Sequence, residues 1–150
     1  MIVLGFSGLY HDSAAALLED GHIVAAAQEE RFTRIKNDAS FPINAIRYCL
    51  NCRNVELKDV DAVVYYDNPM ITLDRFVKNA LHCGADSADL IKFQYDNLFS
   101  ERLLVDRILE KQFGRIGKSG KLMAANHHMS HAASAFYPSP YDEAAILTRD

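Results

Sequence analysis

Three of the six histidines in the chain fall within the stretch HHMSH, directly after an asparagine. On a helix, side chains four positions apart lie on one face with Cβ atoms about 5–6 Å apart, so His127 and His131 could bind one metal ion together. His128 and His131, three positions apart, meet the same condition, and spacing alone does not choose the pair. A second interpretation stays open, in which Asn126 caps the helix and the histidines are solvated or hydrogen-bonded.

A second polar cluster, SGLYHDS, follows the first apolar run of the chain. Gly8 allows a tight turn, and the loop after it carries His11, Asp12 and Ser13. A histidine can accept the proton of a hydroxyl group near neutral pH, and backbone amides in such a loop can bind an anion. His11 is therefore a candidate general base. Asp12 and Ser13 are also typical of a turn in which the side chains bond only their own backbone.

A third cluster is the charged run QEERFTRIKND, which ends an apolar segment. Its side chains could contact a phosphate group or a polar acceptor molecule, and Lys36 and Arg34 are the best candidates for that role. Charged runs at the end of a strand more commonly form a solvated face. This second interpretation also covers Glu29, Glu30 and Arg31.

Composition limits the classes of protein to which these clusters can belong. With 49% hydrophobic and 24% charged residues, the chain has enough apolar surface for one folded core, which excludes a mainly disordered protein. A net charge of -4, with no basic run beyond RFTRIK, argues against nucleic acid as a partner. No apolar stretch is long enough to span a membrane and the first residues lack a leader pattern, so we expect a cytoplasmic protein without a membrane partner.

The three cysteines carry little information about function. Cys49 and Cys52 form a single CxxC and Cys83 is left over, which fits neither an even set of disulfides nor a paired zinc-binding motif. Because Cys49 falls at helical spacing with Ile46, we favour packed, reduced thiols over a redox or metal-binding pair. A reducing compartment suits either interpretation.

Hydrophobic periodicity predicts the elements that position these clusters. Three consecutive strands are expected at 1–7, 14–20 and 22–30, and the glycine in the turn EDGH predicts an antiparallel hairpin between the second and the third. The later expected elements are a helix at about 42–52, a buried strand at 60–66, helices within 71–83 and 89–113, a strand at 120–126, a helix at 128–137 and a last strand at 143–148.

Strands that alternate with helices after an antiparallel start predict an α/β fold, in which helices flank a mixed sheet. The order of elements is similar to one half of the actin-like fold of actin, sugar kinases and heat-shock chaperones, with a helical insertion at about 70–113. No linker or repeat divides residues 1–150, so we expect a single unit. An apolar strand that runs to the last residue has no element to cover it, and we therefore expect the chain to be a piece of a longer protein.

Two stretches resemble the amino-terminal part of the O-carbamoyltransferases that act in nodulation-factor synthesis and antibiotic tailoring. They are GFSGLYHDSAAALLEDGHIVAAAQEERFTRIKNDASFPINAIRYCL and NHHMSHAASAFYPSPYDEAAILTRD, whereas the helical middle matches only in layout. In that family the amino-terminal domain resembles the tRNA threonylcarbamoyl-transfer domain. A carboxy-terminal domain, which this chain does not contain, makes carbamoyl-adenylate from carbamoyl phosphate and ATP. The first domain moves the carbamoyl group to a hydroxyl.

The resemblance implies a metal site and a base for this chain. It selects the HxxxH pair, His127 and His131, as metal ligands and adds Asp150, just beyond the last expected strand, as a carboxylate ligand. Two histidines and one carboxylate suit Fe(II), and Zn(II) and Mn(II) are alternatives. The resemblance also places His11 at the reacting hydroxyl as general base. Asp150 could instead be a surface turn residue.

In the actin-like arrangement, the loop after the first strand faces the nucleotide phosphates, so Ser7 and Gly8, together with Lys36, are the expected nucleotide-binding residues. The expected partners are a small hydroxyl acceptor, carbamoyl phosphate and ATP. We expect the 150 residues alone to be inactive, because adenylate synthesis and half of the transfer cleft would lie outside them. The alternative is a non-catalytic half-domain that binds metal or nucleotide weakly and forms a homodimer through its exposed last strand. A metal-dependent hydrolase is disfavoured, since HHMSH lacks the internal glutamate of HExxH.

Overall fold

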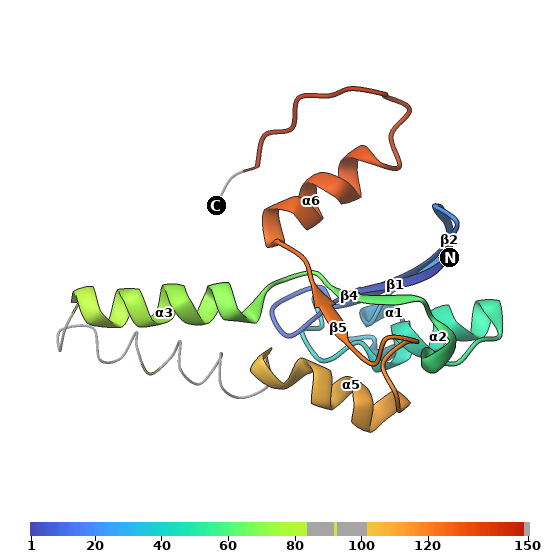
Figure 1. The fold of residues 1–150 in the computed structure, drawn as a ribbon, viewed down its shortest axis with the longest axis horizontal. Coiled ribbons are helices and arrows are strands. Elements are labelled where there is room, and N and C mark those ends of the chain that lie inside the picture. Colours follow the sequence, from blue (N-terminus) through green and yellow to red (C-terminus); the bar gives the residue numbers. More distant parts are fainter. Residues whose placement is uncertain (84–91, 93–101, 149–150) are drawn as a thin grey trace.

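The computed structural model describes residues 1–83, 92 and 102–148. Within them the chain forms an α/β structure, a five-stranded mixed sheet with flanking helices (Figure 1). The strands are β1 (Ile2–Ser7), β2 (Ala14–Glu19), β3 (His22–Gln28), β4 (Ala62–Tyr65) and β5 (Leu122–Ala124). The helices are α1 (Glu30–Thr33), α2 (Ile43–Arg53), α3 (Pro69–Cys83), α5 (Val105–Phe113) and α6 (His127–Phe136), with short 3-10 turns η1 (Leu57–Asp59) and η3 (Arg102–Leu104).

The strand order across the sheet is β3-β2-β1-β4-β5. β1 pairs antiparallel with β2, and β2 pairs antiparallel with β3, which confirms the hairpin predicted from the turn EDGH. Asp20 and Gly21 both have a positive φ, as the tight two-residue turn of such a hairpin requires. β4 joins β1 in parallel and β5 joins β4 in parallel, so the sheet is mixed.

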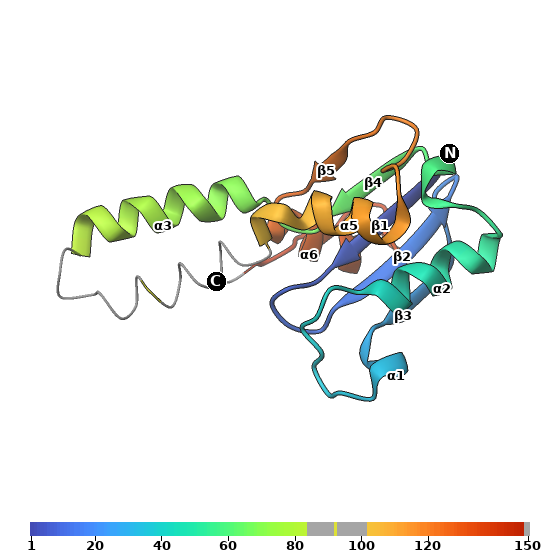
Figure 2. The ribbon, with the colours of Figure 1, turned by 90° about the horizontal axis from the view of Figure 1, so that it is seen from below.

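The two faces of the sheet are covered by different helices. α2 and α5 lie against one face, whereas α6 stands over the other (Figures 1 and 2). Because side chains alternate along a strand, β1 sends Leu4 and Phe6 into the core on the α2 side and leaves Gly5 and Ser7 on the opposite face. The other large buried side chains of this core include Leu17, Ile46, Leu57, Val63, Tyr65, Leu109 and Ile116.

A buried carboxylate joins the sheet to the first long helix. Glu29 follows β3 and is only 2% exposed. Its carboxylate accepts hydrogen bonds from the backbone amides of Asn44 (3.1 Å) and Ala45 (2.8 Å), and from the side-chain amide of Asn44 (2.6 Å). These amides belong to the first turn of α2, whose own N-cap residue is a proline and makes no side-chain cap. The interpretation of the charged run as a solvated face is therefore wrong for Glu29.

Most elements lie where periodicity predicts them. α2, β4, α3, β5 and α6 fall within or next to their expected ranges, although β4 and β5 are shorter. α5 forms the end of the long helical run expected at 89–113; residues 89–91 and 93–101, and with them part of the expected insertion at about 70–113, lie outside the described residues. In the described part of the chain, no helix has both the length and the apolar character needed to cross a membrane.

The strand predicted at 143–148 is wrong. These residues form no strand, and Ile146 and Leu147 are 45% and 95% exposed. A strand is stable only when its backbone groups pair with a neighbour, and this segment pairs with neither β3 nor β5, the two strands at the edges of the sheet. The apolar run has the composition of a strand but lacks a partner.

Replacing Glu29 by alanine is expected to destabilise the chain by about 2–3 kcal/mol, because two backbone amides at the start of α2 lose their acceptor in a buried place. Urea unfolding followed by circular dichroism measures the change. Glu143→Ala, which removes an exposed acid in the C-terminal segment, is the matched control. It should change the free energy of unfolding by less than about 0.5 kcal/mol. Equal stability of the two variants would contradict the capping role.

Candidate functional site

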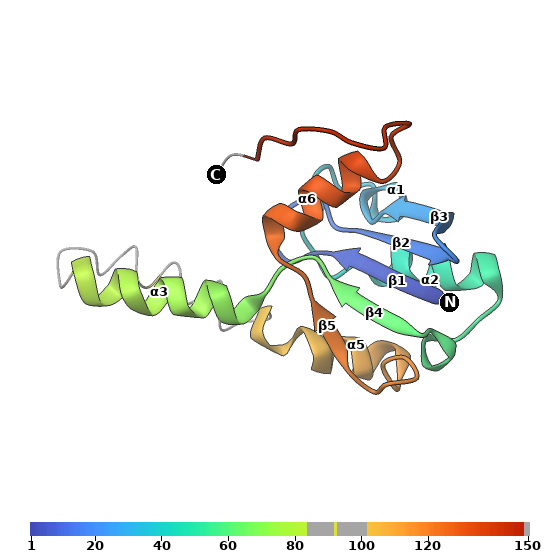
Figure 3. The same ribbon diagram turned by 45° about the horizontal axis from the view of Figure 1, so that its top comes forward.

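Sheet topology brings the polar clusters to one edge. β1, β4 and β5 run parallel, so their carboxyl ends meet at the same edge of the sheet. The loop 8–13, the segment 66–68 and the start of α6 all leave from that edge (Figure 3). Segments that follow the carboxyl ends of neighbouring parallel strands commonly build binding sites. The loop of His11 and the histidine cluster, far apart in sequence, therefore lie on the same side of the molecule.

The histidine pair lies at the start of α6. His127 Nε2 and His131 Nε2 are 3.1 Å apart, and the two ring centroids are 4.7 Å apart. This separation fits a hydrogen bond between the rings, and it is also close to the roughly 3.3 Å between two nitrogens that bind one ion tetrahedrally at about 2.0–2.1 Å each. His128 instead packs edge-on against His127, with centroids 5.7 Å apart. The structure thus brings together the i, i+4 pair.

The cap predicted at the start of α6 is confirmed. Asn126 has an extended backbone, and its side-chain oxygen accepts a hydrogen bond from the backbone amide of His128 at 3.2 Å. This cap uses the backbone amide of His128, while the Nε2 atoms of the pair lie within hydrogen-bond distance of each other. The Ser130 hydroxyl donates to the carbonyl of Tyr66 at 2.9 Å, which ties α6 to the end of β4.

His127 is partly buried against the end of β4. The ring of Tyr66 meets it edge-on, with centroids 5.3 Å apart. Burial lowers the pKa of His127, and the carboxylate of Asp67 opposes this shift. Burial also raises the pKa of Tyr66 to about 12. Because a neutral imidazole is the form that binds a metal ion, the surroundings of His127 favour the ligand form.

Asp150, the carboxylate expected as a further metal ligand, lies outside the described residues. In the ranges 1–83 and 102–148, no group of three or more His, Cys, Asp and Glu side chains is placed to hold a metal ion. The donors that the structure does bring together are the two imidazoles of His127 and His131.

The loop that carries His11 is held from two sides. On the side of the segment that links α1 to α2, the amides of Leu9 and Ser13 donate to the carbonyls of Ala39 and Asp38, at 2.9 and 2.8 Å. These contacts join two loops that lie far apart in the sequence. The loop 8–13 is therefore hydrogen-bonded to the segment between α1 and α2 near both of its ends.

On the other side, the loop contacts β4 and η3. The Tyr65 hydroxyl donates to the carbonyl of Gly8 at 2.8 Å, and Arg102 Nε donates to the carbonyl of Leu9 at 2.8 Å. The guanidinium of Arg102 also lies over the ring of Tyr10, 4.7 Å from its centroid. The segment after β4 thus helps to place the loop.

His11 itself is exposed at this edge. Its Nδ1 lies 2.9 Å from Oδ2 of Asp12, and its ring centroid lies 4.8 Å from that of Tyr10. The other oxygen of Asp12 accepts a hydrogen bond from the side-chain amide of Asn37 at 2.7 Å. The turn interpretation, in which Asp12 bonds only its own backbone, is therefore wrong for Asp12, whose carboxylate contacts two other side chains.

The three residues expected to bind nucleotide, Ser7, Gly8 and Lys36, differ in burial and in position. Gly8 is buried, and a Cβ atom there would lie 2.9 Å from Cδ of Pro42, so close packing alone requires glycine. Ser7 ends β1 on the α6 side of the sheet. Lys36 is exposed in the turn beside Asn37. The structure brings the loop of Ser7 and Gly8 close to the segment that contains Lys36.

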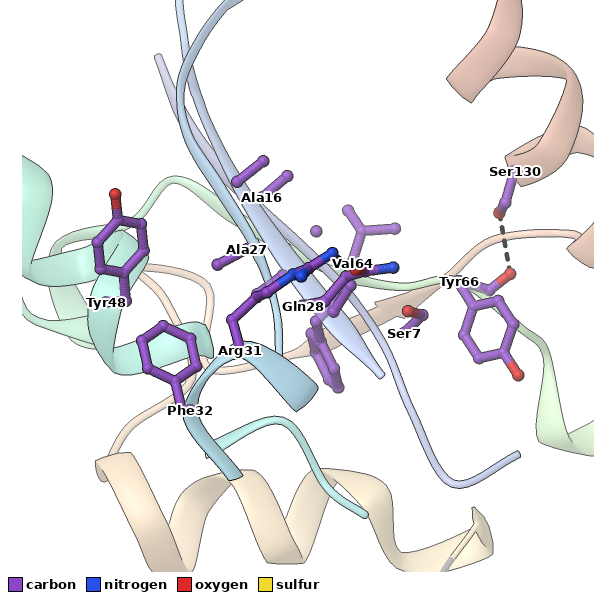
Figure 4. Close-up of a pocket in the computed structure, with 15 residues that line it drawn as sticks. Ser7, Ala16, Ala27, Gln28, Arg31, Phe32, Tyr48, Val64, Tyr66 and Ser130 are labelled. Atoms are coloured by element: carbon purple, nitrogen blue, oxygen red, sulfur yellow. Dashed lines mark hydrogen bonds between the residues drawn. The ribbon is translucent and has the colours of Figure 1, made fainter. Parts of the chain in front are cut away.

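An open groove of about 800 Å³ lies on the α6 side of the sheet (Figure 4). Small side chains of β1, β2 and β3 form its floor, and Ser7 faces it. Tyr66 and Ser130 border the end next to the histidine pair, and Phe32 and Tyr48 border the opposite end. The groove is mainly apolar and opens beside the candidate site.

Three residues near the site were not predicted from the sequence. Asp67 is the second residue after β4, and a carboxylate near the carboxyl end of a strand is a signal that could have found it. Arg102 and Asn37 offered no such signal, because their partners lie 93 and 25 residues away. Contacts at this separation follow from the fold and not from any local pattern.

Known proteins match the chain over almost its whole length. Residues 2–150 match the family described as carbamoyltransferase N-terminus. The chain belongs to this family. The match confirms the resemblance to the amino-terminal domain of the O-carbamoyltransferases.

Relatives of this carbamoyltransferase domain include longer proteins. The uncharacterized protein sll1178 of Synechocystis sp. is 44% identical over 153 residues, which are 99% of this chain and 25% of that protein. The nodulation protein NolNO of Sinorhizobium fredii is 33% identical over 143 residues, 93% of this chain and 19% of that protein. An uncharacterized 19.2 kDa protein of Rhizobium etli is 45% identical over 56 residues, 37% of this chain and 33% of that protein. The chain thus spans a quarter or less of the length of the first two.

Both cysteines of the CxxC in this carbamoyltransferase domain are free. Cys49 is buried on the packed face of α2, where its sulfur lies 3.5 Å from the carbonyl oxygen of Ala15 and 3.7 Å from that of Ala25. Burial raises the pKa of the Cys49 thiol to about 11. Cys52, one turn further along the same helix, is exposed. The interpretation of a packed, reduced thiol is confirmed for Cys49.

Iodoacetamide should alkylate Cys52 at least about 100-fold faster than Cys49 in the native chain at mildly alkaline pH, because only an accessible thiolate reacts. Mass spectrometry of peptides after timed labelling gives the two rates. The same labelling in guanidinium is the control, and there the two rates should become similar. Similar rates in the native chain would mean that Cys49 is not shielded.

Proposed function

We propose that this chain is the amino-terminal part of an O-carbamoyltransferase that moves a carbamoyl group to the hydroxyl of a small acceptor. Membership of the family supports the transferase class, and the nodulation protein NolNO is a relative over 93% of the chain. The observation that carries the proposal is that the His11 loop and the pair His127 and His131 both follow the carboxyl ends of the parallel strands and lie on the same side of the sheet. A base and two metal donors suit transfer from a phosphate-activated carbamoyl group.

The carbamoyl donor in this proposal is carbamoyl-adenylate, made from carbamoyl phosphate and ATP by a part of the protein outside these residues. The strand order β3-β2-β1-β4-β5 is similar to that of one half of an actin-like ATPase fold, and this likeness supports the assignment by analogy. In that arrangement, Ser7 and Gly8 lie beside the nucleotide phosphates and Lys36 supplies a positive charge. In this proposal the 150 residues alone would show no turnover, because half of the cleft would come from residues outside them.

The proposed metal site uses His127 and His131 and, outside the described residues, Asp150. The two imidazoles fit a divalent ion because their Nε2 atoms lie 3.1 Å apart and burial favours the neutral form of His127. Two histidines with a carboxylate suit Fe(II), and Zn(II) and Mn(II) are alternatives. A bound divalent ion supplies positive charge next to the phosphate of the donor.

His11 is the general base of the proposed transfer. Its imidazole accepts the proton of the acceptor hydroxyl, and the hydroxyl oxygen forms a bond to the carbamoyl carbon. The bond from that carbon to the phosphate oxygen breaks, and AMP leaves. The exposure of His11 leaves room for an acceptor, and the hydrogen bonds to the carbonyls of Gly8 and Leu9 hold its loop in place.

His127→Ala and His131→Ala should each weaken the binding of Zn(II) to the chain by at least about tenfold, because each removes one of the two described donors. Calorimetric titration with Zn(II) measures the affinity. His128→Ala keeps the backbone amide that Asn126 caps and should bind Zn(II) like the unchanged chain. His22→Ala, exposed at the start of β3, is a second control. Equal losses in the His127 and His128 variants would show that the chosen pair is wrong.

In a protein that carries this domain at the full length of its relatives, His11→Ala should slow carbamoyl transfer by about 10²–10⁴-fold, because the acceptor loses its base. Formation of carbamoyl-adenylate, followed through the pyrophosphate released from ATP, should stay unchanged. His22→Ala serves as the control variant, because His22 begins β3 and lies at the end of the sheet away from the His11 loop. An equal loss in both reactions, or no loss in transfer, would argue against this role of His11.

A further inference from the structure

His11 and Asp12 are neighbours in the chain, yet their side chains meet. Asp12 has a φ of 48°, in the left-handed region that residues other than glycine seldom adopt. In this conformation its Oδ2 lies 2.9 Å from Nδ1 of His11. The unusual backbone conformation at Asp12 therefore accompanies a specific contact with the proposed base.

The second oxygen of Asp12 is held by a different part of the chain. The side-chain amide of Asn37 donates to Asp12 Oδ1 at 2.7 Å, and the backbone amide of Asn37 donates to Glu30 Oε2 at 3.0 Å. Asn37 is itself left-handed, with a φ of 55°. The next residue, Asp38, accepts a hydrogen bond from the amide of Ser13 at 2.8 Å. The carboxylate is thus fixed between the imidazole and an anchored loop.

The charge of Asp12 determines which nitrogen of His11 carries the proton. The hydrogen bond from Asn37, and after it the one from His11, holds the pKa of Asp12 below its ordinary value. A carboxylate can only accept hydrogen bonds, so the Nδ1 atom that contacts it has to be the donor. A neutral imidazole has a single proton, and Nε2 of His11 then keeps its lone pair.

We propose that Asp12 is a positioning residue for His11, and that Asn37 holds the Asp12 carboxylate in place. Asp12 keeps His11 in the tautomer with the proton on Nδ1, which leaves Nε2 to accept the proton of the acceptor hydroxyl. When His11 takes that proton, the carboxylate stabilises the imidazolium that forms. This inference rests on the proposed role of His11 as general base and names the groups that prepare it.

The tautomer of His11 tests the inference directly, because a role of Asp12 in loop structure alone would leave it unaffected. Long-range ¹H–¹⁵N NMR spectra of the labelled chain, recorded at a pH above the range of histidine titration, distinguish the two tautomers. We expect the Nδ1–H form to predominate at His11 in the unchanged chain and to lose its majority in Asp12→Asn. Asp74→Asn, which removes an exposed carboxylate on α3, is the matched control and should leave the tautomer unchanged.

A majority of the Nε2–H form in the unchanged chain, or the same population in Asp12→Asn as in the unchanged chain, would overturn the proposal. Asn37→Ala provides a second test if Asp12→Asn does not fold. It keeps the carboxylate and removes its anchor, so the majority of the Nδ1–H form should shrink. An unchanged population in Asn37→Ala would overturn the anchoring role of Asn37.

Activity separates this inference from the proposed function. At the full length of the relatives, Asp12→Asn should lower kcat for carbamoyl transfer by about tenfold to a thousandfold with little change in KM, and Asp12→Glu should recover part of the loss. If His11→Ala retains transfer, the proposed base is wrong, and the catalytic part of this inference falls with it. If His11→Ala abolishes transfer while Asp12→Asn keeps full kcat, the base stands and the positioning role is wrong.

Discussion

Glu29, a buried residue at the end of β3, connects the His11 loop with the start of α2. Its backbone amide donates to the carbonyl of Ser13 at 2.8 Å, and its side chain caps α2. A single residue therefore links the end of β3, the start of a helix that covers the sheet and the end of the loop. Because both ends of the segment 30–42 are fixed in this way, residues 37–39 lie alongside the loop and hold it. The hydrogen bonds from Leu9 and Ser13 to residues 38 and 39 therefore belong to the same connection as the helix cap.

Parallel pairing of β1, β4 and β5 is the second constraint. Parallel neighbours need a crossover connection, so the residues at their carboxyl ends come from distant parts of the chain. His11 and His127 share one edge of the sheet for this reason, and Arg102, from the connection between β4 and β5, reaches the same loop. A site built in this way takes its groups from separate connections, and each connection can vary while the sheet is kept.

The strands and the hairpin could be predicted because each depends on a local pattern, whereas spacing left two histidine pairs open and the family resemblance selected His127 and His131. Strand periodicity and the turn at Gly21 both act within a few residues. The capping role of Glu29 could not be predicted, because Glu29 belongs to a charged run that is typical of a solvated face. Its partner Asn44 lies 15 residues away in the sequence. The strand expected at 143–148 failed because apolar composition is local, whereas strand pairing is not. The contact of Arg102 spans 93 residues, and no local pattern contains it.

The distances in sequence between these partners also determine the order in which the chain can acquire its structure during synthesis. The β2–β3 hairpin joins neighbouring segments and can close as soon as it leaves the ribosome, whereas β1 has to wait for β4. Arg102 reaches the carbonyl of Leu9 later still, 93 residues on. At about 5–20 residues per second, that interval lasts roughly 5–20 s. Until β4 emerges, the nascent chain presents β1 with one unpaired edge, the kind of surface that makes chaperones necessary.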